Sequence, residues 1–243
     1  MEKAGQHQID LKMIGGLAVY QQCGVTTCGG LERQPYKDID FLGKSDQNIK
    51  AEYFFKKLGF RRVGLNDWGA NIEFHNYRAQ VDGLNRELDI EVYFGSLEFN
   101  HLIPKPYFSS TYPFTIPPGQ LLLSKWAIVD LTEKDIIDIG TLLLNFDIGD
   151  QYEKSLSQSY LNSAFSDGLA GARMAKTCTI NLTLLQKYFN EGKIENDSRV
   201  KLFNQFTILD KILTDASVST IWKIRNNFGL EKKWYRDAQP RQI

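Results

Sequence analysis

Cysteine is scarce in this chain, with three cysteines in 243 residues. Cys23, Cys28 and Cys178 are an odd number, and such a set suits a reducing compartment better than a disulfide framework. A zinc site at Cys23 and Cys28 would need further ligands, and the chain has only three histidines, which disfavours such a site. We therefore expect the cysteines to be free thiols.

The sequence has no excess of charge and no long apolar run. The 29 basic side chains balance 29 acidic ones, which disfavours nucleic-acid binding by overall charge and leaves room for a local basic patch. Lys125 and Asp130 interrupt the longest apolar stretch, at 121–131, which is far shorter than the ~20 residues of a membrane span. The first residues lack the apolar segment of a secretory signal. We expect a soluble, cytoplasmic protein without a membrane partner.

Proline is missing from most of the second half, where only Pro240 lies beyond residue 118. The charge changes sign in the same region. Residues 1–148 contain 15 Lys or Arg and 19 Asp or Glu, whereas residues 149–243 contain 14 and 10. We therefore predict two domains, an α/β domain at 1–148 and a helical bundle at 149–243.

Hydrophobic periodicity predicts the individual elements. Strands are expected at 11–14, 38–42, 60–63, 71–74, 79–81 and 88–94, with a tight hairpin at Asp82-Gly83 between the last two. Helices are expected from residue 17, at 49–58, 118–131, 133–145, 151–166, 168–191, 196–214 and 217–228. Thr132 and Asp135 resemble the cap of the helix at 133–145.

A diglycine followed by two alternating aspartates is the feature that points to chemistry. Gly15-Gly16 follows a strand and opens a helix, where backbone N–H groups can approach a phosphate. Asp38 and Asp40 point to the same side of the next strand. Two such carboxylates repel each other unless a cation lies between them, and oxygen ligands suit Mg²⁺. The pattern favours nucleotide chemistry assisted by divalent metal ions.

These residues, IGGLAVYQQCG followed by KDIDFLG, resemble the nucleotidyltransferase superfamily with its polymerase-β-like fold. The chain looks most like the abortive-infection toxin-type branch. Three further blocks carry this resemblance, which are ELDIEVYFGSLEFNH, LLLSKWAIVDLTEKDIID and WKIRNNFGLEKKWY. The resemblance implies a mixed sheet flanked by helices and followed by a C-terminal helical bundle domain.

The resemblance also implies roles for single residues. Asp38, Asp40 and Asp89 would bind Mg²⁺ or Mn²⁺, and Asp89 could also act as the base for an attacking hydroxyl. Gly15 and Gly16 would border the triphosphate, Lys125 would neutralise phosphate charge, and Asp135 or Asp138 would orient that lysine or the substrate. These are catalytic or nucleotide-binding roles.

Each assignment has a plainer alternative. Alternating aspartates are often solvated, and Glu91 or Asp82 could replace Asp89 as the third carboxylate. Lys125 could extend from an apolar helix face into solvent. Asp135 or Asp138 could serve only as a helix cap, and His101 could be a structural hydrogen-bond partner. Aromatic and basic residues interleave in the C-terminal block, which could be a stacking surface for RNA or a solvated helix end. These residues are Trp222, Lys223, Arg225, Lys232, Lys233, Trp234, Tyr235 and Arg236.

The expected function is transfer of a nucleoside monophosphate from a nucleoside triphosphate to a hydroxyl of RNA such as tRNA, of a protein or of a small molecule. A cognate antitoxin or a second copy of the chain is the macromolecular partner that the toxin-type resemblance implies. One rival is a degenerate relative that binds a nucleotide or a partner without turnover, which is favoured by Gly16 standing where many members have serine. Another rival, an antibiotic nucleotidyltransferase, is disfavoured by the basic second region.

Overall fold

The computed structural model describes residues 2–64, 74–105, 108–109, 111–151, 154–217 and 235. The main helices are α1 (Glu2–Gln6), α2 (Gly15–Cys23), α3 (Asn48–Lys57), α4 (Pro118–Trp126), α5 (Glu133–Asn145), α6 (Gln158–Ser166), α7 (Gly168–Glu191) and α8 (Asn196–Ser217). The strands of the main sheet are β1 (Leu11–Ile14), β4 (Asp38–Gly43), β5 (Arg61–Val63), β6 (Phe74–Gln80) and β7 (Glu87–Phe94). Two-residue strands form three small pairs, β2 (Thr27–Cys28) with β3 (Leu31–Glu32), β8 (Leu97–Glu98) with β9 (Leu102–Ile103), and β10 (Ile148–Gly149) with β11 (Leu156–Ser157).

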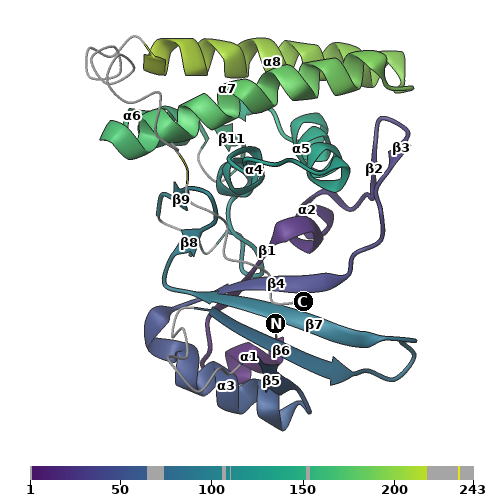
Figure 1. Cartoon of the computed structure of the whole chain (residues 1–243), viewed down its shortest axis with the longest axis vertical. Helices are drawn as coiled ribbons and strands as arrows, with labels where there is room; N and C mark the ends of the chain where they lie inside the picture. Colours follow the sequence, from purple (N-terminus) through teal and green to yellow (C-terminus); the bar gives the residue numbers. More distant parts are fainter. Residues whose placement is uncertain are drawn as a thin grey trace.

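The five main strands form one mixed sheet in the order β1-β4-β7-β6-β5 (Figure 1). β4 and β7 are parallel, and the other neighbours are antiparallel. The predicted mixed sheet flanked by helices is therefore confirmed. Two strands were expected at 71–74 and 79–81, but β6 is one strand because His75, Tyr77 and Ala79 alternate inward without interruption. Residues 71–73 lie outside the described part, and the predicted hairpin joins β6 to β7.

The sheet has a different core on each face. On one face, α1 and α3 cover a small cluster that includes Phe41, Ile90 and Val92. On the other face, Leu42 belongs to a larger cluster that includes side chains of α2, α4 and α5 and continues into α6, α7 and α8. Residues on both sides of position 148 therefore contribute to one hydrophobic core.

The polar side chains around α4 explain why it is shorter than expected. The pattern predicted a helix as far as 131, but α4 ends at Trp126. Asn181 of α7 donates hydrogen bonds of 2.7 Å to the carbonyl oxygens of Trp126 and Ile128, and Asn100 accepts one from the Val129 amide. Because side chains satisfy these backbone groups, the chain can leave the helix here.

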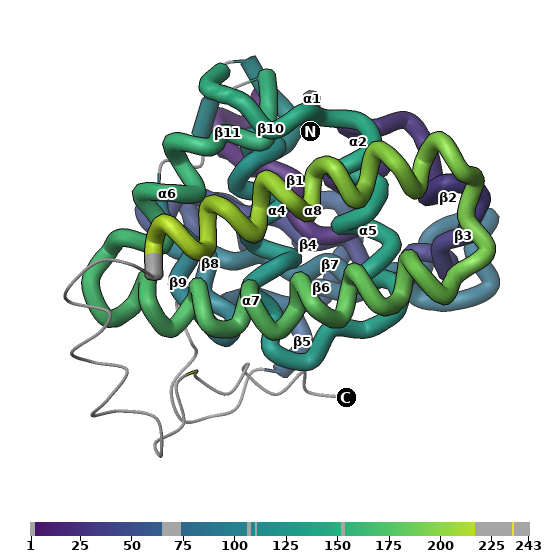
Figure 2. Tube along the Cα trace, turned by 90° about the horizontal axis from the view of Figure 1, so that it is seen from above, coloured from purple at the N-terminus to yellow at the C-terminus, as the bar shows by residue number. Residues whose placement is uncertain are grey.

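The C-terminal helical region is the upper layer of Figure 1, where α7 and α8 lie side by side, as Figure 2 also shows. The start of α6 differs from the expected residue 151, because β11 precedes it and Ser157 Oγ accepts a hydrogen bond from the Tyr160 amide as its cap. Ser217, where a further helix was expected to begin, is the last residue of α8. Residues 218–228 of that expected helix and most of the aromatic and basic C-terminal block lie outside the described residues.

The segment that precedes α4 is fastened to β1. Lys12 Nζ donates hydrogen bonds to three backbone carbonyl oxygens, those of Ser109 at 2.9 Å, Tyr112 at 2.6 Å and Pro113 at 3.1 Å. The Met13 amide donates to the carbonyl of Phe114 at 2.7 Å. Burial lowers the pKa of Lys12, and the three carbonyl groups replace the water that its ammonium group gives up.

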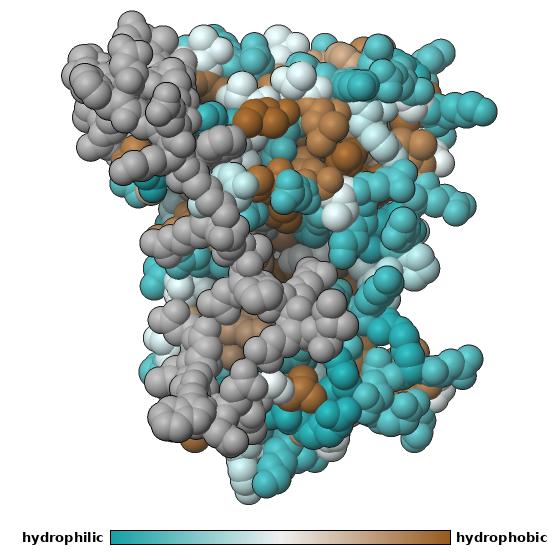
Figure 3. Space-filling model, viewed as in Figure 1, coloured by the Kyte–Doolittle hydropathy of each residue, from teal (hydrophilic) through white to brown (hydrophobic). Residues whose placement is uncertain are grey.

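Apolar side chains gather on one face of the helical region, in the upper half of Figure 3, while polar side chains dominate around the sheet below. Among the described residues, no helix is both long and apolar enough to cross a membrane.

Candidate functional site

Four carboxylates share one face of the two parallel strands. Asp38 pairs with Asp89 and Asp40 pairs with Glu91 in the register of β4 and β7. Directly paired residues project from the same face of a sheet, and alternate residues along a strand do so too. The intervening Ile39, Phe41, Ile90 and Val92 pack into the core on the other face. The acidic face is therefore the one that carries α2, α4 and α5.

Gly15, at the end of β1 and the start of α2, approaches this acidic face closely. Its φ of +68° lies in the left-handed region, and a Cβ atom built there would overlap the Asp40 carboxylate. A glycine is needed for both reasons. The diglycine and the alternating aspartates, which are separated in the sequence, are thus neighbours in space.

We expect Gly15→Ala to be more destabilising than the same change at Gly83, which also has a positive φ of +84° but nothing within 4 Å of an added Cβ. Backbone strain costs about 1–2 kcal/mol at each position, and only Gly15→Ala must also displace Asp40. Urea unfolding of the two variants measures the difference. Equal losses of unfolding free energy would contradict the close approach of Gly15 to Asp40.

Asp89 has a basic partner in this structure. Arg78 of β6 donates a hydrogen bond from Nε to Asp89 Oδ1 at 2.6 Å, and the two residues are paired in the register of β6 and β7. Glu91 is buried and accepts a hydrogen bond of 3.2 Å from the Tyr93 hydroxyl. Within the part of the chain that is described, no three His, Cys, Asp or Glu side chains are gathered closely enough to hold a metal ion as they stand. Asp82 lies apart from these four acids, in the hairpin turn.

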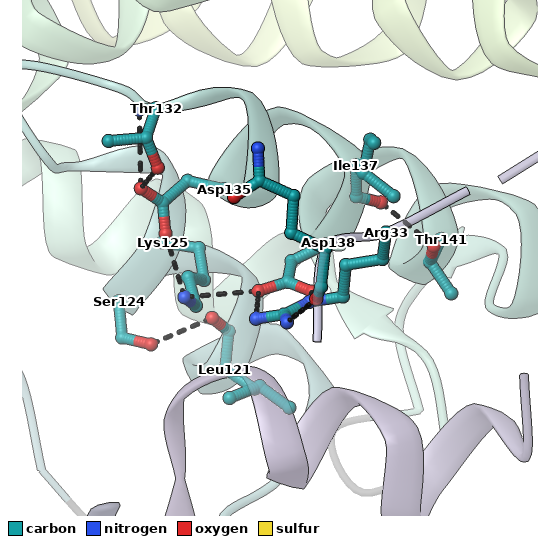
Figure 4. A network of polar contacts seen from close by, with 10 residues as sticks. Arg33, Leu121, Ser124, Lys125, Thr132, Asp135, Ile137, Asp138 and Thr141 are labelled. Atoms are coloured by element: carbon teal, nitrogen blue, oxygen red, sulfur yellow. Dashed lines mark hydrogen bonds and ion pairs between the residues drawn. The ribbon is translucent and has the colours of Figure 1, made fainter. Parts of the chain in front are cut away.

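Lys125 forms buried ion pairs rather than reaching solvent (Figure 4). Its Nζ lies 2.8 Å from Asp135 Oδ1 and 3.1 Å from Asp138 Oδ2, and its side chain is 11% exposed. Sequence reasoning expected one of these two acids to lie beside Lys125, and both do. The alternative of a lysine extending into solvent is wrong, because α4 packs inside the larger core.

Asp135 has a second role at the start of α5. Its Oδ2 accepts hydrogen bonds from the backbone amide and the hydroxyl of Thr132, which completes the capping box expected at this position. Burial alone would raise the pKa of Asp135, but Lys125 and Thr132 together lower it below its usual value. Burial would likewise lower the pKa of Lys125, but Asp138, Asp135 and the more distant charge of Asp40 outweigh it and raise that pKa. Lys125 and Asp135 are therefore both ionised, and Lys125 lies within electrostatic reach of Asp40.

Arg33 is the residue that sequence reasoning missed. Its Nε and Nη2 donate to the two carboxylate oxygens of Asp138 at 2.5 and 3.1 Å, as Figure 4 shows. Its guanidinium carbon lies 4.0 Å from the centre of the Tyr36 ring, and a Cβ atom on Gly16 would overlap Nη2. Arg33 lies in an irregular segment and 105 residues from Asp138, so neither periodicity nor spacing could reveal it.

A small cavity adjoins Asp38. It has a volume of about 170 Å³ and lies between the segment before β4 and the start of α5. Its lining includes Arg33, Tyr36, Asp38, Thr132 and Lys134. The cavity therefore has both an aspartate of β4 and a buried arginine in its wall.

His101 has a structural role in this arrangement. Its Nε2 forms a 2.8 Å hydrogen bond with the Thr177 hydroxyl of α7, and burial together with Arg173 lowers its pKa to about 4. The imidazole is therefore neutral at pH 7. It links the loop after β8 to the helical region, which fits the structural alternative for this residue.

No protein-family model and no curated protein matches the chain. Among solved structures, the chain is similar to the aminoglycoside nucleotidyltransferase ANT(2'')-Ia in complex with adenylyl-2''-tobramycin, with 16% identity, a TM-score of 0.36, and coverage of 58% of this chain and 82% of that one. It is similar to JHP933 from Helicobacter pylori, with 13% identity, a TM-score of 0.43, and coverage of 95% and 93%. It is also similar to a candidate nucleotidyltransferase from H. pylori, with 12% identity, a TM-score of 0.43, and coverage of 88% and 98%. These similarities concern the fold.

Proposed function

We propose that the chain is a nucleotidyltransferase, which transfers a nucleoside monophosphate from a nucleoside triphosphate to an acceptor hydroxyl. The observation that carries this proposal is the acidic face of β4 and β7 beside Gly15. Two buried cations accompany it, Arg33 against Gly16 and Lys125 within electrostatic reach of Asp40. Carboxylates and cations placed side by side can bind a metal–triphosphate complex, whose two parts have opposite charge.

The donor set fits Mg²⁺ or Mn²⁺, because both prefer carboxylate oxygens and the register aligns four of them on neighbouring strands. Asp38 and Asp40 would be the first two ligands. Asp89, which is paired with Arg78 in this structure, or Glu91 would be the third. When bound, the metal neutralises phosphate charge and lowers the pKa of the attacking hydroxyl.

The remaining residues of the site bind and orient the nucleotide. Gly15 and Gly16 let the triphosphate approach the N-terminus of α2, where backbone N–H groups favour an anion. Lys125 contributes positive charge, and Asp135 and Asp138 hold its ammonium group in place. Asp89 accepts the proton of the acceptor hydroxyl when that group attacks the α-phosphorus and pyrophosphate leaves.

The acceptor that we favour is RNA, with tRNA as the first to test. Residues 149–243 carry 14 basic and 10 acidic side chains, whereas an aminoglycoside acceptor, which is polycationic, would call for an acidic surface. A protein hydroxyl is the alternative outcome of the same experiment. The toxin-type branch and a cognate antitoxin or homodimer stay predictions from the resemblance.

A degenerate, nucleotide-binding protein is the second candidate function. The ion pair between Arg78 and Asp89 favours it, because a permanently paired Asp89 would leave only two aspartates for the metal. Binding without transfer would identify this function.

The test is a thermal-shift series with each nucleoside triphosphate and Mg²⁺ or Mn²⁺, followed by transfer of labelled nucleotide to total tRNA and to cell extract. A ligand at ~100 times its Kd should raise the melting temperature of the wild type by about 5–10 °C. The double variant Asp38→Asn/Asp40→Asn should lose both the shift and the transfer, because neutral amides are poor ligands for these ions.

Asp82→Asn provides the matched control, since this exposed aspartate lies in the hairpin turn and outside the acidic face. It should respond like the wild type. If no triphosphate raises the melting temperature of the wild type with either metal, the proposed function is wrong.

A further inference from the structure

The Arg33 guanidinium group lies against the start of α2. Its side chain is only 6% exposed, although it belongs to an irregular segment at the surface of the sheet. Nη2 lies against Gly16, and Arg33 is one of the residues that line the cavity beside Asp38. The arginine therefore touches the diglycine turn and shares a cavity wall with the first aspartate.

The guanidinium group has donors to spare. It carries five N–H hydrogens. Nε and Nη2 each donate one to Asp138, at 2.5 and 3.1 Å. Nη1 donates one to the Gln34 carbonyl oxygen at 2.8 Å. This leaves one hydrogen on Nη1 and one on Nη2, both on a side chain that is more than nine-tenths buried.

Asp138 and Tyr36 hold the group in one orientation. The two-pronged contact with Asp138 fixes the guanidinium plane, and the Tyr36 ring lies against it at 4.0 Å. Burial opposes the charge of Arg33, but Asp138 outweighs this effect and raises its pKa, so the group is positively charged at every pH of interest. A fixed, charged fork with two remaining donors is suited to bind two oxygens of a phosphate.

We infer that Arg33 is a phosphate-binding residue of the nucleotide site, an inference that rests on the proposed function. The two remaining N–H groups contact phosphate oxygens of a nucleoside triphosphate at the diglycine turn, while Asp138 keeps the guanidinium in place. Asp138 is then a positioning residue for two cations, because it also holds Lys125 at 3.1 Å.

The experiment measures Kd values of the full-length protein with Mn²⁺ and two probes, the best-binding nucleoside triphosphate and inorganic triphosphate. Arg33→Gln should weaken binding of both probes by about tenfold or more, because charge-assisted hydrogen bonds to phosphate are lost. The second probe lacks base and sugar, so an equal loss for both locates the effect at the phosphates.

Arg62→Gln is the matched control. Arg62 is also a largely buried arginine, with 14% exposure, and its ion pair with Glu52 of α3 lies at the other end of the sheet. Its variant should bind both probes within about twofold of the wild type, because it removes the ion pair of a largely buried arginine far from the diglycine turn.

If the wild type binds the probes and the Kd values of Arg33→Gln lie within twofold of the wild-type values, the inference is overturned and the proposed function is preserved. A wild type that binds neither probe would refute the proposed function first. If Arg33→Gln does not fold, Arg33→Lys takes its place, since it keeps a cation beside Asp138 but cannot hold the acid and two phosphate oxygens together. Equal affinity of Arg33→Lys and the wild type for both probes would also overturn the inference.

Discussion

Replacing Asp138 with alanine should lower the free energy of unfolding by about 3–5 kcal/mol, because it leaves two buried cations without their shared counter-charge. The Asp138 side chain is 1% exposed, and it pairs with Arg33 and with Lys125. Arg33 loses its two-pronged partner entirely, whereas Lys125 keeps Asp135. Urea unfolding of the wild type and the variant measures the loss.

Asp147→Ala is the control for this change. Asp147 also forms an ion pair, at 3.3 Å with Lys201, but its side chain is 83% exposed. Its removal should change the unfolding free energy by less than ~1 kcal/mol, because water screens exposed pairs. If Asp138→Ala also changed the unfolding free energy by less than ~1 kcal/mol, water would have to reach the network.

Lys125→Met should lower the free energy of unfolding by about 3 kcal/mol or more at pH 7, because two buried carboxylates then lose the cation between them. From the sequence alone, methionine would be expected to leave folding nearly unchanged, since it keeps the alkyl chain in an apolar helix. The buried ion pairs with Asp135 and Asp138 reverse that expectation. The same unfolding experiment measures the effect.

The loss caused by Lys125→Met should also shrink in acid. In the wild type, the pKa of Asp135 is lowered from 3.8, so its contribution to stability is present above that value and disappears as the pH falls through the folded pKa. In the variant, burial without Lys125 raises that pKa, and protonation relieves the buried charge. A loss of unfolding free energy that is constant from pH 7 to pH 3 would contradict this account.

Local patterns predicted the elements that carry the acidic face. Ile39 and Phe41 alternate with Asp38 and Asp40, so β4 and its two faces could be read directly from the sequence. The cap of α5 was also predictable, because Thr132 and Asp135 are three residues apart. Such features depend only on neighbours in the chain.

Features that depend on distant partners could not be predicted. The end of α4 depends on Asn181, 53 to 55 residues away, which accounts for the predicted helix being too long. The ion pair of Asp89 with Arg78 depends on the register between two strands. The roles of Asp38, Asp40, Asp89 and Lys125 in binding stay predictions, for which the geometry supplies the candidate partners.

Lys12 and the segment that it fastens have a consequence for association between chains. β1 is an edge strand, and such a strand ordinarily exposes backbone groups to which another chain can add a strand. Here the Met13 amide is already bonded to Phe114, and the buried charge of Lys12 anchors the covering segment through three carbonyl groups. A second chain would have to strip off that segment and return a buried ammonium group to water. We therefore expect the lysine to disfavour strand addition at this edge.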